Sequence, residues 1–170
     1  MLENCVEIIE KAACLMFEAI KDGNKILWCG NGGSAAQAQH LSTELVGGLR
    51  DHDRPAIPSI SLTTDSSFLT AWSNDTDFNS VFSRQISALG QKGDVLIGIT
   101  TSGNSDNVIK AVDIAEEMGI YTIVFTGKNG GEINKKAEII IAIPSDDTQR
   151  IQEGHILCGH ILCELMEQSL

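Results

Sequence analysis

The sequence predicts an α/β fold with a doubly wound, five-stranded parallel sheet flanked by helices, and two observations carry this prediction. Short, nearly continuous apolar runs alternate with longer segments of helical periodicity along the 170 residues, and strands of this kind are covered on both faces. Two glycine- and hydroxyl-rich turns, at 30–34 and 100–105, each follow a strand and lead into a helix, as in βαβ units. We expect one domain spanning 1–170, because the length and the 42% hydrophobic content suffice for one core.

The expected elements are bounded by turn and cap residues. Asp22-Gly23-Asn24 ends the first helical segment, Gly119 follows another, and Ser145-Asp146-Asp147 is suited to cap the last. Residues 65–90 are expected to be helical in pieces, with a break near Asn74-Asp75. The other expected helices are Glu3–Ile20, the segment from the first glycine turn through Glu44, Ser105–Met118 and Gln149–Gln168; the expected strands are Lys25–Cys29, Ser59–Leu62, Asp94–Thr100, Tyr121–Thr126 and Ile139–Ile143.

Composition disfavours several classes of partner. The chain carries 23 acidic and 12 basic residues, a net charge of −11, and its basic residues form no patch, so nucleic acid is not an expected partner. An anionic ligand would therefore need directed backbone donors and hydroxyls. The apolar runs are far shorter than the roughly 18 residues of a membrane span, so no membrane partner is expected either.

The N-terminal segment and the cysteines indicate a cytoplasmic protein. The first helical segment is amphipathic and acidic, and it lacks the basic start and cleavage site of a signal peptide. The five cysteines are an odd set without Cys-x-x-Cys spacing, which suits reduced thiols in a core better than a disulfide framework.

The first glycine turn, Gly30-Asn31-Gly32-Gly33-Ser34, precedes a helix that carries His40 and Glu44. Glycines allow a tight turn, and the helix N-terminus leaves N–H donors for an anion. His40 and Glu44 share a helix face, where they could provide a base acting next to a carbonyl or two ligands for Zn²⁺. The turn lacks the lysine of a Walker loop and the later acidic residue of a dinucleotide fingerprint, which disfavours ATP and NAD. A purely structural turn and a solvated helix pair are the alternatives.

The second turn, Thr100-Thr101-Ser102-Gly103-Asn104-Ser105, is rich in hydroxyls. Hydroxyls and backbone N–H groups can surround a phosphate without a lysine. Alternatively, Ser105 is only an N-cap and Gly103 only a turn residue. Because both turns should open at the carboxyl edge of one parallel sheet, together they predict a site for a phosphorylated small molecule.

The last helix contains two of the four histidines, His155 and His160. Five residues separate them, which places them roughly 140° apart around a helix axis, so only one can face the site. The spacing alone does not say which. A histidine satisfied by a single hydrogen bond is the ordinary outcome for either.

With these residues in view, the chain resembles the SIS (sugar isomerase) domain family, and within it the branch that isomerises heptose phosphates. The resemblance covers nearly the whole chain. It rests on segments that occur in the expected order: Cys29–Ser34, His40 with Glu44, Leu69–Asp75, Phe82-Ser83-Arg84, Gly93–Ile99, Thr101–Ser105, and Arg150–Glu153 with His160.

The resemblance implies an aldose–ketose isomerase that interconverts sedoheptulose 7-phosphate and D-glycero-D-manno-heptose 7-phosphate through an enediol(ate), in heptose synthesis for surface glycans such as lipopolysaccharide or capsule. It implies that Glu44 moves a proton between adjacent carbons and that His160 serves the enediol oxygens, a division of labour like that in triosephosphate isomerase. The implied substrate contacts are Asn31, Gly32, Gly33, Ser34, His40, Glu44, Asn74, Asp75, Thr100, Thr101, Ser102, Ser105 and Gln152.

The resemblance also implies a homotetramer with one Zn²⁺ per subunit, held by His40, Glu44, Gln152 and His160. A metal there would polarise the carbonyl. Gln152 and His160 lie eight residues apart, about 12 Å along a straight helix. We therefore expect one of these two ligands to come from a neighbouring subunit, so that the site is shared.

Two other functions remain open from the sequence. A non-catalytic SIS module that senses a phosphosugar or binds a partner protein needs the two turns but not the acid–base residues, so Glu44 and His160 favour the enzyme. An isomerase of another phosphosugar is the second alternative, because the turns recognise a phosphate and not the length of the sugar.

Overall fold

A five-stranded parallel sheet with the strand order β2-β1-β3-β4-β5 forms the centre of the computed structural model, which describes residues 2–170. This is the predicted fold class. The strands are β1 (Ile26–Gly30), β2 (Ser59–Ser61), β3 (Val95–Ile99), β4 (Tyr121–Gly127) and β5 (Ile139–Ile143). The helices are α1 (Leu2–Lys21), α2 (Gly33–Gly47), α3 (Ser66–Asp75), α4 (Val81–Leu89), α5 (Asp106–Glu117) and α6 (Thr148–Gln168), with 3₁₀ turns η1 (Phe78–Ser80) and η2 (Glu132–Lys135).

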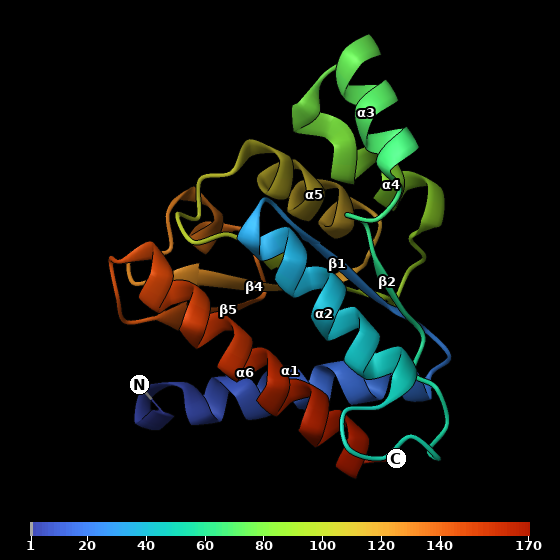
Figure 1. The fold of residues 1–170 in the computed structure, drawn as a ribbon, viewed down its shortest axis with the longest axis vertical. Helices are drawn as coiled ribbons and strands as arrows, with labels where there is room; N and C mark the ends of the chain where they lie inside the picture. The colour runs from blue at the N-terminus through green and yellow to red at the C-terminus, as the bar shows by residue number, and fades with distance from the viewer. Residues whose placement is uncertain (1) are drawn as a thin grey trace.

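Helices cover both faces of the sheet, because alternate strand residues point to opposite sides. In β1, Ile26 and Trp28 join the core under α1, α2 and α6, whereas Leu27 and Cys29 join the core under α4 and α5. All five residues of β1 and of β3 are buried, which explains why these strands read as continuous apolar runs. Figure 1 shows α1 crossing α6, with α2 passing diagonally over the same face.

The strand order reverses between β1 and β3, the two adjacent central strands. Doubly wound sheets bind ligands at such a reversal, beyond the carboxyl ends of the strands. The glycine turn after β1 and the hydroxyl turn after β3 both emerge there. The sheet therefore brings together the two turns that the sequence singles out.

The structure agrees with the expected elements to within a few residues. The break expected near Asn74-Asp75 is present, because α3 ends at Asp75 and η1 and α4 follow as separate pieces. The helix after the first glycine turn runs three residues beyond Glu44, to Gly47. The short turn η2 was not expected from the sequence.

Helix α3 has a distinct position. None of its residues is buried, and in Figure 1 it stands away from the body of the fold, above α4. Its packing partners within the chain are η1 and α4.

All five cysteines are free thiols, and four of them are buried. Within residues 2–170, no helix combines the length and the apolar character that crossing a bilayer requires.

Candidate functional site

The first turn presents an uncapped helix N-terminus. Gly32, at the N-cap of α2, has a φ of 54°, and no side chain caps the helix. A side chain at Gly30 would meet the carbonyl oxygen of Ile99 and the backbone of Ser34 at 3.0 Å. Glycine is thus needed at position 32 for the positive φ and at position 30 for the close approach to β3. The turn leaves amide donors in the first turn of α2 for a ligand.

The second turn is held by its own hydroxyls. The Thr100 Oγ1 atom lies 3.0 Å from the Ser105 Oγ atom and accepts a hydrogen bond from the Gly103 N–H at 3.2 Å. Ser105 occupies the N-cap position of α5, but its side chain does not cap the helix. The interpretation of Ser105 as an ordinary capping side chain is therefore wrong. A cavity of about 230 Å³ opens beside this turn, lined by Thr101, Ser102, Gly127, Lys128, Asn129, Gly130, Ser145, Asp146, Thr148 and Ile151.

A pair of amide side chains joins the first turn to the start of α5, the helix that follows the second turn. Asn31 donates to the Asn107 Oδ1 atom at 2.8 Å, and Asn107 donates to the Asn31 Oδ1 atom at 2.9 Å. Asn107 is 2% exposed. Asn107 was not predicted from the sequence, although a polar residue among the buried positions Val108, Ala111 and Val112 of α5 was a possible signal. These two bonds orient the Asn31 amide and leave its second N–H group and a second lone pair on its oxygen for a substrate.

His40, Glu44 and His160 come together in one chain. One ring nitrogen of each histidine and one carboxylate oxygen of Glu44 all lie within 4.8 Å of one another. The two imidazole Nε2 atoms are 2.7 Å apart, and the Glu44 Oε1 atom is 3.4 Å from the His40 Nε2 atom. The Glu44 side chain is 17% exposed, whereas that of His40 is 45% exposed. The cluster is thus open to solvent on one side, as an acid–base site for a small molecule requires.

A close approach of α2 and α6 makes this cluster possible. Gly159, the residue before His160, is buried, and a side chain there would collide with Leu41 of α2. Helices approach so closely only where one lacks a side chain. Nearby, the Gln152 side chain lies against Gly33, and the backbone carbonyl oxygen of Gln152 accepts a hydrogen bond from the Gln37 side-chain amide at 2.7 Å. Gln152 therefore adjoins the first turn.

His155 lies on another face of α6, in the core. It is completely buried, its ring packs against Phe125, and its Nε2–H group donates to the Thr126 carbonyl oxygen at 3.1 Å. Burial lowers the pKa of His155 from 6.5 to about 4, and the bond to Thr126 opposes that change. Its Nδ1 atom has no partner among the described residues. Of the two histidines that the sequence left open, His160 is the one at the cluster.

The buried His155 predicts a pH-dependent stability. Its folded pKa is depressed, so between pH 6.5 and about 4 the unfolded chain binds a proton there and the folded chain does not. The free energy of unfolding therefore keeps its full value above pH 6.5. It falls by roughly 3 kcal/mol in total as the pH drops toward 4. Urea unfolding at several pH values across this window is expected to show a steeper loss for the wild type than for His155→Gln. Equal slopes would contradict the prediction.

The donor set of the cluster fits a zinc ion. Zn²⁺ accepts imidazole nitrogen and carboxylate oxygen, and catalytic zinc sites commonly use three protein ligands. His40, Glu44 and His160 supply such a set from α2 and α6. The expectation that Gln152 is a fourth ligand stays a prediction.

Asn74 and Asp75 lie apart from this cluster along the fold. Both are exposed near the end of α3, and the Asn74 amide donates to the Asp75 carboxylate at 2.8 Å. Because α3 packs on η1 and α4 rather than on α2 or α6, one chain does not gather these two residues with His40 and His160. Their expected role as substrate contacts stays a prediction.

Comparison with known proteins identifies the family of the chain. A family model described as the SIS domain matches residues 1–127. Phosphoheptose isomerase from Aliarcobacter butzleri is 50% identical over 170 residues, covering 100% of this chain and 89% of the relative. Phosphoheptose isomerase from Aquifex aeolicus is 54% identical, covering 95% and 84%.

Solved structures give the same result. A phosphoheptose isomerase from Neisseria gonorrhoeae superposes with a TM-score of 0.91 at 45% identity, covering 96% of this chain and 87% of that one. One from Francisella tularensis superposes with a TM-score of 0.92 at 38% identity, covering 95% and 86%. The chain belongs to the phosphoheptose isomerase family of SIS domain proteins.

Proposed function

We propose that this protein interconverts sedoheptulose 7-phosphate and D-glycero-D-manno-heptose 7-phosphate. It is a phosphosugar isomerase by its family, and its relatives carry the name phosphoheptose isomerase. The observation that supports the assignment most is the cluster of His40, Glu44 and His160 beside two uncharged anion-binding turns. A carboxylate with two imidazoles suits proton transfer, and the turns suit a phosphate.

Proton transfer needs no external oxidant or reductant, because an aldose and its ketose are isomers. In the proposed mechanism, the Glu44 carboxylate takes a proton from the carbon next to the carbonyl and returns it to the adjacent carbon. The His160 imidazole moves a proton between the two oxygens of the enediol. The neighbouring His40, with its Nε2 atom 2.7 Å from that of His160, orients the second ring.

The two turns would hold the far end of the substrate. Thr100, Thr101, Ser102 and Ser105 offer hydroxyls at the N-terminus of α5. Gly32 and Gly33 offer amides and Ser34 a hydroxyl at the N-terminus of α2, where the Ser34 N–H group already donates to the Asn31 carbonyl oxygen at 2.9 Å. Gln152, which adjoins Gly33, would contact the sugar. Binding the phosphate at a distance from the reacting carbons places those carbons against Glu44, and such positioning supplies a large part of a rate enhancement.

A zinc ion, one per subunit, is part of the proposal. His40, Glu44 and His160 would hold it with Gln152. When bound, it would supply polarisation of the substrate carbonyl.

We further propose that the enzyme is a cytoplasmic homotetramer whose site is shared between subunits, and that its product feeds heptose synthesis for a surface glycan. Two features support assembly: α3, which has no buried residue within one chain, carries Asn74 and Asp75 away from the cluster, and Val6 and Phe78 are more than half exposed. A neighbouring copy could cover these apolar groups and bring Asn74 and Asp75 to a second site.

The test of the function is incubation of the protein with sedoheptulose 7-phosphate in deuterated water, followed by NMR. New aldose signals with deuterium at the carbon next to the carbonyl are the expected result. Absence of both, with folded protein and added zinc, would contradict the assignment and favour a binding module. Turnover of a different ketose phosphate alone would change the substrate but not the reaction.

Replacing Ser105 by Ala is expected to weaken substrate binding. The change removes a hydroxyl from the second turn and leaves the Thr100 Oγ1 atom without its partner at 3.0 Å. Hydrogen bonds to charged groups contribute about 1.5 to 3 kcal/mol, so KM should rise roughly tenfold or more with little change in kcat. Steady-state kinetics measures both constants, with Ser87→Ala, on the outer side of α4, as the control. A lowered kcat with unchanged KM would contradict a binding role.

A further inference from the structure

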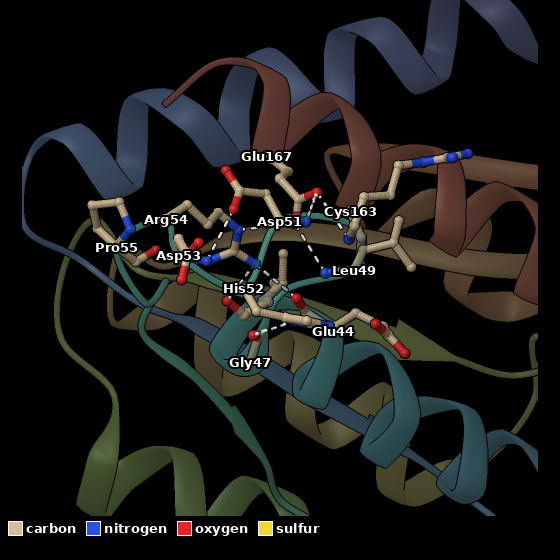
Figure 2. Close-up of polar contacts among 12 residues, drawn as sticks. Glu44, Gly47, Leu49, Asp51, His52, Asp53, Arg54, Pro55, Cys163 and Glu167 are labelled. Carbon is tan, nitrogen blue, oxygen red and sulfur yellow. Dashed lines mark hydrogen bonds and ion pairs between the residues drawn. The ribbon is translucent and has the colours of Figure 1, made fainter.

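A buried ion pair fixes the end of the helix that carries Glu44. The segment between α2 and β2 folds back so that Arg54 contacts both the last turn of α2 and the last turn of α6 (Figure 2). The Arg54 Nε atom lies 3.0 Å from the Glu167 Oε2 atom, and the two side chains are only 6% and 8% exposed. A buried charge pair thus lies at the end of the helix that carries the proposed base.

The Arg54 guanidinium binds the backbone of Glu44 itself. Its Nη2 atom donates to the Glu44 carbonyl oxygen at 2.8 Å and to the Leu45 carbonyl oxygen at 2.9 Å. Its Nη1 atom donates to the Pro55 carbonyl oxygen at 2.8 Å. The Glu44 carbonyl oxygen also accepts the Gly48 N–H group at 3.1 Å, and the Leu45 carbonyl oxygen accepts the Ile57 N–H group at 3.2 Å, so Arg54 adds a second donor to each. A positive charge at this end of a helix is favourable. Arg54 therefore acts as a side-chain cap for α2 at the residue that carries the proposed base.

The Glu167 carboxylate is held from several sides. It accepts hydrogen bonds from the N–H groups of Leu49 at 2.9 Å and of Arg50 and Asp51 at 3.0 Å, in addition to the Arg54 bond. Burial by itself would raise the pKa of Glu167, but these four bonds outweigh it and lower the pKa to about 2. The carboxylate thus remains charged at neutral pH and immobilises the loop.

The pair links the two helices that form the cluster. Glu167 lies seven residues after His160, two turns along the same face of α6. The Gly159–Leu41 contact lies near the middle of both helices, the Gln37–Gln152 hydrogen bond lies toward their N-termini, and the Arg54–Glu167 contact lies at their C-terminal ends. The Arg54–Glu167 contact thus supplies the anchor on the C-terminal side of the cluster, and contacts on both sides fix the angle between the helices and with it the distance between His40 and His160.

From this geometry we propose that Arg54 and Glu167 are positioning residues, which hold Glu44 and His160 in register for proton transfer. The inference rests on the proposed isomerase function. Neither residue touches the substrate in this proposal. They act through the Glu44 backbone and through α6.

The experiment compares Arg54→Gln with Arg54→Lys and with the control Arg50→Gln. Arg50 lies in the same loop and pairs with Glu164 of the same helix at 2.9 Å, but its side chain is 69% exposed. Exposed ion pairs contribute little, so this variant is expected to keep kcat within about twofold. Arg54→Lys keeps the charge but has one nitrogen in place of the Nε, Nη1 and Nη2 atoms that bind Glu167, Pro55 and the α2 carbonyls, so it should recover only part of the loss.

For Arg54→Gln, kcat is expected to fall about 100-fold with KM nearly unchanged, the size of effect that a displacement of about 1 Å produces. The imidazole ¹⁵N NMR signals of His40 and His160 should move in the same variant and stay in place in Arg50→Gln. The double variant Arg54→Gln/Glu167→Gln should lose no more than the larger single loss, because the two residues act as a unit.

A lower melting temperature with normal kcat and unmoved histidine signals would overturn the inference and leave a purely structural ion pair. Wild-type protein without isomerase activity would instead contradict the proposed function. In that case the histidine signals still decide whether Arg54 positions the cluster, because they do not depend on the sugar.

Discussion

Glu44→Gln is expected to lower kcat by roughly 10²- to 10⁴-fold, the contribution of a well-placed general base. Glutamine is nearly isosteric and keeps the helix, and the bonds from Arg54 go to the backbone of residue 44, so the fold should survive. What is lost is the carboxylate that lies 3.4 Å from the His40 Nε2 atom. Steady-state kinetics and exchange of the substrate C–H proton in deuterated water measure the effect.

The control for this variant is Glu164→Gln, which removes a carboxylate of α6 that pairs with the exposed Arg50. It should leave both turnover and exchange close to wild type. Near-normal exchange in Glu44→Gln would exclude Glu44 as the base, and another group would have to take the proton.

His160→Gln is expected to lower kcat by a similar factor, between roughly 10²- and 10⁴-fold, because it removes the imidazole that we propose serves the enediol oxygens. The matched comparison is His155→Gln, five residues earlier on the same helix. That ring is buried against Phe125 and bonded to Thr126, away from the cluster. Its loss should lower the free energy of unfolding and reduce kcat far less.

The two variants are compared at a temperature where both remain folded, as judged by circular dichroism. Equal losses of kcat would remove the basis for assigning the acid–base role to His160. A larger loss in His155→Gln would reverse the assignment.

Much of the fold could be predicted from the sequence, because central parallel strands are apolar on both faces and their helices end at glycines. The runs around Leu27 and Leu96 are examples. Less predictable was the outward position of α3: its sequence shows helical pieces, but no local pattern says that one chain leaves every residue of the helix unburied.

The candidate site, too, could be predicted only in part. His40 and Glu44 are four residues apart, so a local pattern pairs them. The choice of His160 over His155 depends on which face of α6 meets α2, which is a tertiary property that the close Gly159–Leu41 contact sets. The pairing of Arg54 with Glu167 could not be predicted from the sequence, because two residues separated by 113 positions leave no periodic signal.

The reciprocal amide bonds between Asn31 and Asn107 have a consequence for how this fold can diversify. They hold the turn after β1 against the first turn of α5, the helix that follows the turn after β3. The distance from these two turns to Glu44 is then set by the length of α2, and changes in loop sequence do not alter it. A related enzyme that accepts a shorter or longer sugar must therefore change the residues that surround the middle of the sugar. The distance between the two turns and Glu44 would stay the same.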